Sequence, residues 1–164
     1  MALSKLDRLY RAVILDHSSN PHHRGVLEGV TPLELNNPTC GDVIRLSIRL
    51  DKDKKIEDIA FDGSGCSIST ASASMMTDLV LGKTIEEACE LSEIFSQLVQ
   101  GEDIGEMDEK LGDAAFLQGV SQFPQRIKCA TLSWNALKKL MDVEVGESVV
   151  EESCSHFEND GEKE

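Results

Sequence analysis

The chain has 164 residues, which fits one ordinary domain. Its 40% hydrophobic content is enough for a core, and 16 Lys and Arg against 30 Asp and Glu give a net charge of −14. A surface this acidic repels phosphate backbones and anionic lipids, so we expect no nucleic-acid partner and no membrane partner.

The acidic charge is uneven along the chain. Residues 147–164 hold seven acids and one Lys, so we expect a single domain over 1–146 followed by an acidic disordered tail over 147–164. Two interpretations of the acidic main body stay open: a basic protein partner, or a surface that is simply soluble. The N-terminus scatters its charges and lacks the unbroken apolar run of a signal peptide, which predicts a cytoplasmic protein.

The first half of the chain reads as a helix followed by strands. Apolar spacing predicts a helix that Ser4 caps and Asn20-Pro21 ends, and the two histidines that follow, His22 and His23, are expected with His17 to be solvated. A short strand is expected near 33–35. Alternating apolar residues predict a hairpin of strands over 43–50 and 56–61, which the glycines near residue 63 are expected to end.

The second half reads as helices. A helix over 66–81 begins with many small side chains, and we expect these to let its backbone lie close to the sheet. Thr84-x-x-Glu87 is a capping box for a helix to Val99, and a loop with short helices is expected between 101 and 120. Pro124 is expected to end the last of these short helices, and a final helix is expected over 127–141, whose apolar stripe belongs to the core. The predicted class is α+β, a small antiparallel sheet of about three strands packed on one side by several helices.

Three of the five cysteines fall at boundaries between predicted elements, where functional side chains are commonly placed. These are Cys40, Cys66 and Cys129, whereas Cys89 lies within a helix and is interpreted as structural, and Cys154 is interpreted as an incidental thiol of the tail. In a reducing compartment such cysteines favour metal binding or thiol chemistry over disulfides.

The residues around these cysteines suggest a metal site. Asp42 follows Cys40 by two positions, so both side chains share a face of an extended segment. Three thiolates and one carboxylate suit tetrahedral Zn²⁺, and Arg126 or Lys128 would offset part of their negative charge. The spacings of 26 and 63 residues match no zinc-ribbon signature. Three unrelated thiols therefore remain the alternative.

The motifs resemble those of the IscU/NifU-type iron–sulfur assembly family. The matching segments are Asn37-Pro38-x-Cys40-Gly41-Asp42, Gly65-Cys66-x-Ile68-Ser69-x-Ala71-Ser72-Ala73-Ser74 and Cys129-Ala130, and the similarity runs over about residues 4–142. Scaffold members of the family carry a His where this chain has Lys128. They also lack an extra segment like the one at about 101–123. Both departures, with the ending Arg126-x-x-Cys129, resemble the SufU branch of zinc-dependent sulfurtransferases.

The resemblance implies an IscU/SufE-like fold and Zn²⁺ held by Cys40, Asp42, Cys66 and Cys129. It also implies an enzyme in which Cys40 accepts sulfur from a SufS-like cysteine desulfurase, for downstream SUF scaffold proteins. In this branch a His of the desulfurase is thought to replace a protein ligand on zinc and so free Cys40. Arg126 would bind the partner or steady the freed thiolate, or be an ordinary surface Arg.

Two other functions stay open at this point. One is a scaffold that assembles a [2Fe–2S] cluster, or holds iron, on the same cysteines. The other is an adaptor that zinc stabilises but that performs no catalysis.

Overall fold

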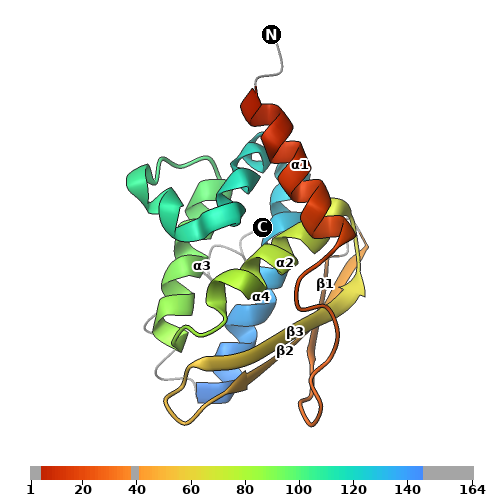
Figure 1. Cartoon of the computed structure of the whole chain (residues 1–164), viewed down its shortest axis with the longest axis vertical. Coiled ribbons are helices and arrows are strands. Elements are labelled where there is room, and N and C mark those ends of the chain that lie inside the picture. The colour runs from red at the N-terminus through yellow and green to blue at the C-terminus, as the bar shows by residue number, and fades with distance from the viewer. Residues whose placement is uncertain (1–4, 38–40, 146–164) are drawn as a thin grey trace.

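The computed structural model describes residues 5–37 and 41–145, and it has the predicted α+β architecture (Figure 1). The predicted tail over 147–164 lies outside these residues. The elements in chain order are α1 (Lys5–Ser19), β1 (Leu33–Asn37), β2 (Asp42–Leu50), β3 (Ile56–Ser64), α2 (Ser67–Val80), α3 (Ile85–Val99), the 3₁₀ segment η1 (Gly105–Gln122) and α4 (Pro124–Val145). Among the described residues, no helix combines the length and the apolar character that a bilayer crossing requires.

The sheet is antiparallel in the order β1-β2-β3, with the helices to one side of it (Figure 1). Ile44, Leu46 and Ile48 alternate along β2 and are all buried, as the sequence pattern predicted. The strand β3 runs to Ser64, so the predicted break near residue 63 was wrong. Gly63 has a φ of +137°, and a Cβ there would lie 2.1 Å from the Val43 carbonyl oxygen, so this glycine permits close strand contact instead of ending the strand.

The small side chains of α2 face helices more than the sheet, which corrects the expected packing. The Ser72 hydroxyl donates to the Ala130 carbonyl of α4 at 2.6 Å and accepts from Trp134 Nε1 at 3.2 Å. On the other side of α2, the Ser74 hydroxyl contacts His17 of α1. The helix α2 therefore lies between α1 and α4, and small residues are what allow both to approach it.

The helix α4 carries the centre of the core. It begins at Pro124, three residues before the predicted start at 127, so Pro124 opens this helix as well as following the end of η1. Proline suits the first helical turn because its missing N–H would have had no intrahelical acceptor. Trp134 is fully buried and stacks on Phe95 of α3 with ring centroids 4.5 Å apart. The capping box predicted for α3 is present, with Thr84 and Glu87 each accepting the other's backbone N–H.

The segment after α1 runs along the edge of β3. The Gly25 N–H donates to the Phe61 carbonyl at 2.8 Å, and the Phe61 N–H donates to the His23 carbonyl at 3.0 Å. Arg24 donates to the Gly63 carbonyl and lies 3.5 Å from Asp62. The backbone N–H of Gly63 lowers the pKa of Asp62, and Arg24 adds to this effect. These contacts fix the path of residues 22–25 against the body of the protein.

Candidate metal centre

Three of the four predicted metal ligands meet where one strand and two helices begin. Asp42 opens β2, Cys66 is the N-cap of α2, and Cys129 lies in the second turn of α4. One carboxylate oxygen and the two sulfur atoms lie within 4.8 Å of one another. Asp42 and Cys129 are buried and Cys66 is partly exposed, so the cluster is reached from the Cys66 side. Cys40, the fourth predicted ligand, lies outside the described residues.

The carboxylate of Asp42 is aimed by the start of α2. Its Oδ1 accepts the backbone N–H of Cys66 at 3.0 Å, and its Oδ2 lies 3.9 Å from the Cys66 sulfur. This approach requires Gly65, because a Cβ at that position would lie 2.8 Å from Oδ1. One oxygen is thus used for orientation, and the other faces the thiol.

The sulfur of Cys66 sits at a helix N-terminus. It accepts the backbone N–H of Ser69 at 3.4 Å, which makes Cys66 a side-chain cap. The Ser69 N–H and the positive end of the α2 dipole therefore face this sulfur. On the α4 side, the Ser72 contacts with Ala130 and Trp134 hold the helix beside α2 and so fix the position of Cys129.

The donor set suits a soft or borderline metal ion. Zinc bonds of about 2.3 Å to sulfur and 2.0 Å to oxygen place the two donors about 3.5 Å apart in a tetrahedral site. The 3.9 Å between Asp42 Oδ2 and the Cys66 sulfur needs only a small closure to reach that value. Two thiolates, one carboxylate and one further donor therefore fit Zn²⁺, and the same thiolates would also fit an iron–sulfur cluster. The ligand roles themselves stay predictions.

Arg126 lies on the rim of a hollow next to the cluster. Ser67 and Ile68 of the first turn of α2 line this hollow, together with Val120, Phe123 and Arg126. Arg126 is exposed, and Phe123 keeps 59% of its surface open to solvent. The predicted role of Arg126 is untested, but its position beside the first turn of α2 places it near Cys66.

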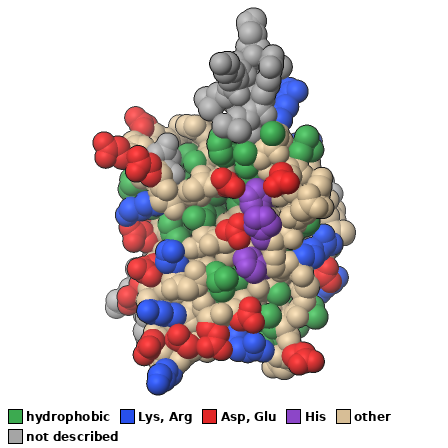
Figure 2. Space-filling model, in the orientation of Figure 1, with side chains coloured by type: hydrophobic (Ala, Val, Ile, Leu, Met, Phe, Trp, Pro, Cys, Tyr) green, Lys and Arg blue, Asp and Glu red, His purple; other side chains and the backbone are tan. Residues whose placement is uncertain are grey.

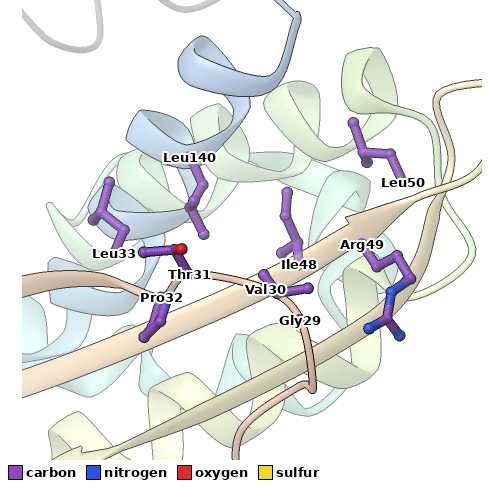
Figure 3. A pocket seen from close by; sticks show the side chains of 9 residues that line it. All are labelled: Gly29, Val30, Thr31, Pro32, Leu33, Ile48, Arg49, Leu50 and Leu140. Carbon is purple, nitrogen blue, oxygen red and sulfur yellow. The ribbon is translucent and has the colours of Figure 1, made fainter.

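A second hollow lies at the other end of the sheet and offers no comparable chemistry (Figure 3). Its lining includes Ile48 and Leu50, which lie six and eight residues along β2 from Asp42, or about 20 and 26 Å. The charged group of its lining is Arg49, whose guanidinium donates to the Glu28 carbonyl at 2.6 Å and to Asp58. We therefore place the functional site at the Asp42 end.

The prediction of solvated histidines was wrong for His17, and all three histidines have protein partners. His17 is 2% exposed, and its ring contacts Ser74 and Asp113. His22 and His23 contact Asp78 and Thr77 of α2. The acidic partners are 56 to 96 residues away in sequence, so no local pattern indicated them. Cys89 is buried in α3, as its structural interpretation requires, and Cys154 lies outside the described residues.

Comparison with known proteins decides the family. The family model described as the NifU-like N terminal domain matches residues 9–130. The chain belongs to the NifU-like N-terminal domain family, in its SufU branch. It is 54% identical over 143 residues to a Bacillus subtilis protein named zinc-dependent sulfurtransferase SufU, covering 87% of this chain and 96% of the relative.

Other members of the NifU-like family carry scaffold names. A Streptococcus pyogenes protein named iron–sulfur cluster assembly scaffold protein IscU is 62% identical over 139 residues, covering 85% of this chain and 86% of the relative. A Fervidobacterium islandicum crystal structure, titled a putative iron–sulfur cluster assembly scaffold protein for the SUF system, aligns with a TM-score of 0.72. It is 33% identical and covers 77% of this chain and 92% of that one. These names agree on iron–sulfur cluster assembly in general. They differ on the mechanism, since one relative is named a sulfurtransferase and the others are named scaffolds.

We predict that Gly65→Ala weakens zinc binding while the fold is kept. The added methyl group pushes Asp42 Oδ1 away from the Cys66 N–H, and misplacing a ligand costs about tenfold in affinity. Competition with a chromophoric chelator measures the zinc affinity, and Ser64→Ala is the matched control in the same segment. Equal zinc affinity in Gly65→Ala and Ser64→Ala would show that the position of Asp42 does not matter for the metal.

Proposed function

We propose that this protein is a zinc-dependent sulfurtransferase that accepts persulfide sulfur from a cysteine desulfurase for iron–sulfur cluster assembly. The observation that carries the proposal is the convergence of Asp42, Cys66 and Cys129 from three separate elements. The similarity to a relative named a zinc-dependent sulfurtransferase supports it. The reducing cytoplasm expected from the sequence would keep the thiols available.

In this proposal Cys40 completes the metal site. Two Cα–Cα steps separate Cys40 from Asp42, so their Cα atoms can be at most about 7.6 Å apart. Chain connectivity therefore allows the Cys40 thiol to reach the other three donors. Zinc, when bound by Cys40, Asp42, Cys66 and Cys129, would hold the thiols deprotonated and supply no redox chemistry of its own.

Cys40 is also the proposed nucleophile. Its thiolate attacks the outer sulfur of the persulfide on the desulfurase, and a new sulfur–sulfur bond forms on Cys40. The persulfide bond of the donor breaks, and the donor cysteine leaves as a thiolate with the electron pair, so no oxidant or reductant is consumed. Gly41, next to Cys40, has a φ of +76°, which L residues rarely adopt, and its N–H donates to the Asn37 carbonyl at 2.8 Å, so a side chain at this position would strain the turn.

The hollow beside Cys66 is the proposed contact for the desulfurase. Exposed Phe123 offers apolar area and Arg126 offers a cation, and both line the hollow together with Ser67, the neighbour of Cys66. Aromatic and Arg side chains are enriched among the residues that dominate protein interfaces. The sulfur would then pass from Cys40 to downstream SUF scaffold proteins.

The second candidate function is a [2Fe–2S] assembly scaffold that uses the same cysteines. The relative from Streptococcus pyogenes, which is 62% identical and bears a scaffold name, favours this alternative. Lys128 favours sulfur transfer, because the scaffold branch carries a His at that position. The two functions differ in what Cys40 must do: a sulfur acceptor needs it as a nucleophile, whereas a scaffold needs it as a ligand.

We expect the zinc-loaded protein to accelerate cysteine desulfurase turnover on L-cysteine and Cys40→Ala to abolish that acceleration. The reason is that removal of sulfur from the desulfurase requires an acceptor thiolate. Sulfide and alanine release measures turnover, and Cys154→Ala is the matched control because it removes a thiol outside the predicted site. If Cys40→Ala accelerates turnover as well as Cys154→Ala does, Cys40 is not the acceptor. Absence of acceleration by the unchanged protein would favour the scaffold.

We also expect Arg126→Ala to lower desulfurase acceleration about tenfold or more without changing the zinc content. Arg126 is exposed and is not a predicted ligand, so its loss should affect the encounter with the partner and not the metal. Lys139→Ala, an exposed cation farther along α4, is the control for net charge. Equal acceleration by the two variants would identify Arg126 as an ordinary surface residue.

A further inference from the structure

A second cluster of metal-binding side chains lies at the opposite end of α2. His17 comes from the last turn of α1, His22 from the segment after it, and Asp78 from the last turn of α2. One ring nitrogen of each histidine and one Asp78 oxygen lie within 4.8 Å of one another. Figure 2 shows histidine side chains gathered in a column on one face of the molecule, with acidic side chains beside them. None of these residues takes part in the proposed sulfur-transfer site.

The two clusters are separate sites. Cys66 caps the first turn of α2, and Asp78 lies twelve residues later on the same helix. At 1.5 Å per residue this places them about 18 Å apart along the helix axis. An ion bound near Asp78 would therefore share no ligand with the cluster of Asp42, Cys66 and Cys129.

Hydrogen bonds fix the His17 ring and the backbone of His22 relative to α2. The Nδ1 atom of His17 contacts the Ser74 hydroxyl at 2.7 Å, and its Nε2 atom lies 3.0 Å from an Asp113 oxygen. Ser74 also accepts the backbone N–H of His22 at 2.8 Å, which fixes the second histidine relative to the first. An ion would replace one of the two His17 contacts, and the other contact would then orient the ring, as the second nitrogen of a metal-ligating histidine commonly does.

The two carboxylate oxygens of Asp78 face His22 and His23. Its Oδ2 lies 2.5 Å from His22 Nδ1, and its Oδ1 lies 3.6 Å from His23 Nδ1. The His17 and His22 rings are adjacent, with centroids 4.7 Å apart. The side chains of His22 and Asp78 are 44% and 40% exposed, so an ion can enter from solvent and these two residues can adjust to it. His17 is buried and provides the fixed side of the cluster.

The local charge also favours a cation. Two carboxylates, Asp78 and Asp113, lie against the ring nitrogens of His22 and His17. The chain as a whole carries a net charge of −14, which raises the local concentration of divalent cations. Imidazole with carboxylate is a donor set that suits Zn²⁺, Ni²⁺ and Cu²⁺.

We propose that His17, His22 and Asp78 form a second divalent transition-metal site, with Asp113 as a further carboxylate beside His17. In a tetrahedral zinc site such donors lie about 3.3 Å apart, which small rotations of the exposed His22 and Asp78 side chains can reach. The bound ion would join the end of α1 to the end of α2. Because metal that binds only the folded state stabilises it, this site would tighten the attachment of α1.

The test is a zinc titration of the full chain by calorimetry, with the bound metal analysed after dialysis. The unchanged protein is expected to bind two zinc ions. His22→Ala and Asp78→Asn are expected to keep the first ion and to bind the second at least tenfold more weakly. Glu57→Gln, which removes an exposed acid from β3, is the matched control and is expected to bind two ions. Cys66→Ser is expected to weaken the first ion and leave the second in place.

The ring resonances of His17 and His22 give a second readout that does not depend on stoichiometry. In the protein already holding one zinc ion, a second equivalent is expected to shift the nuclear magnetic resonance signals of both rings in Glu57→Gln but not in Asp78→Asn. A single bound zinc ion that Cys66→Ser loses and Asp78→Asn retains would overturn the proposal. Equal affinity for the second ion in Asp78→Asn and Glu57→Gln would overturn it as well. The cluster would then be a hydrogen-bonded anchor for α1.

Discussion

The contact between Asp42 and the N-terminus of α2 is the constraint on which the site depends. A buried carboxylate is costly unless hydrogen bonds satisfy it, and here the Cys66 N–H does so at 3.0 Å. The contact joins the first residue of β2 to the first turn of α2, across the close approach that Gly65 permits. It therefore sets where the Cys66 sulfur lies, and the α2–α4 packing then brings Cys129 to the same place.

Most of the fold could be predicted because its signals are local. Apolar spacing located α1 and α4, alternation located β2, and Thr84-x-x-Glu87 marked the start of α3. The errors arose where a residue has two structural uses. Pro124 opens a helix as well as it ends one, and Gly63 allows close strand contact as well as a turn. Sequence alone does not tell which use applies, because that depends on the neighbouring backbone.

In the candidate site, too, the residues with local sequence signals could be predicted and those that depend on distant partners could not. Cysteines at element boundaries drew attention to Cys66 and Cys129, and the structure brings both to Asp42. The histidines were misjudged because burial of His17 depends on Asp113 and Ser74, which are distant in sequence. A polar residue next to a loop gives no local sign of such partners. Long-range pairing of this kind appears only when the packing of α1 on α2 is known.

The measurement that tests the central claim most directly is zinc X-ray absorption spectroscopy of the full chain loaded with one equivalent of Zn²⁺. The account predicts three sulfur donors at about 2.3 Å and one oxygen donor at about 2.0 Å. It also predicts that Asp42→Ala removes that protein oxygen from the spectrum or weakens zinc retention. A first shell of nitrogen and oxygen without sulfur, or four sulfurs, would contradict the assignment of Cys40, Asp42, Cys66 and Cys129 as the ligands.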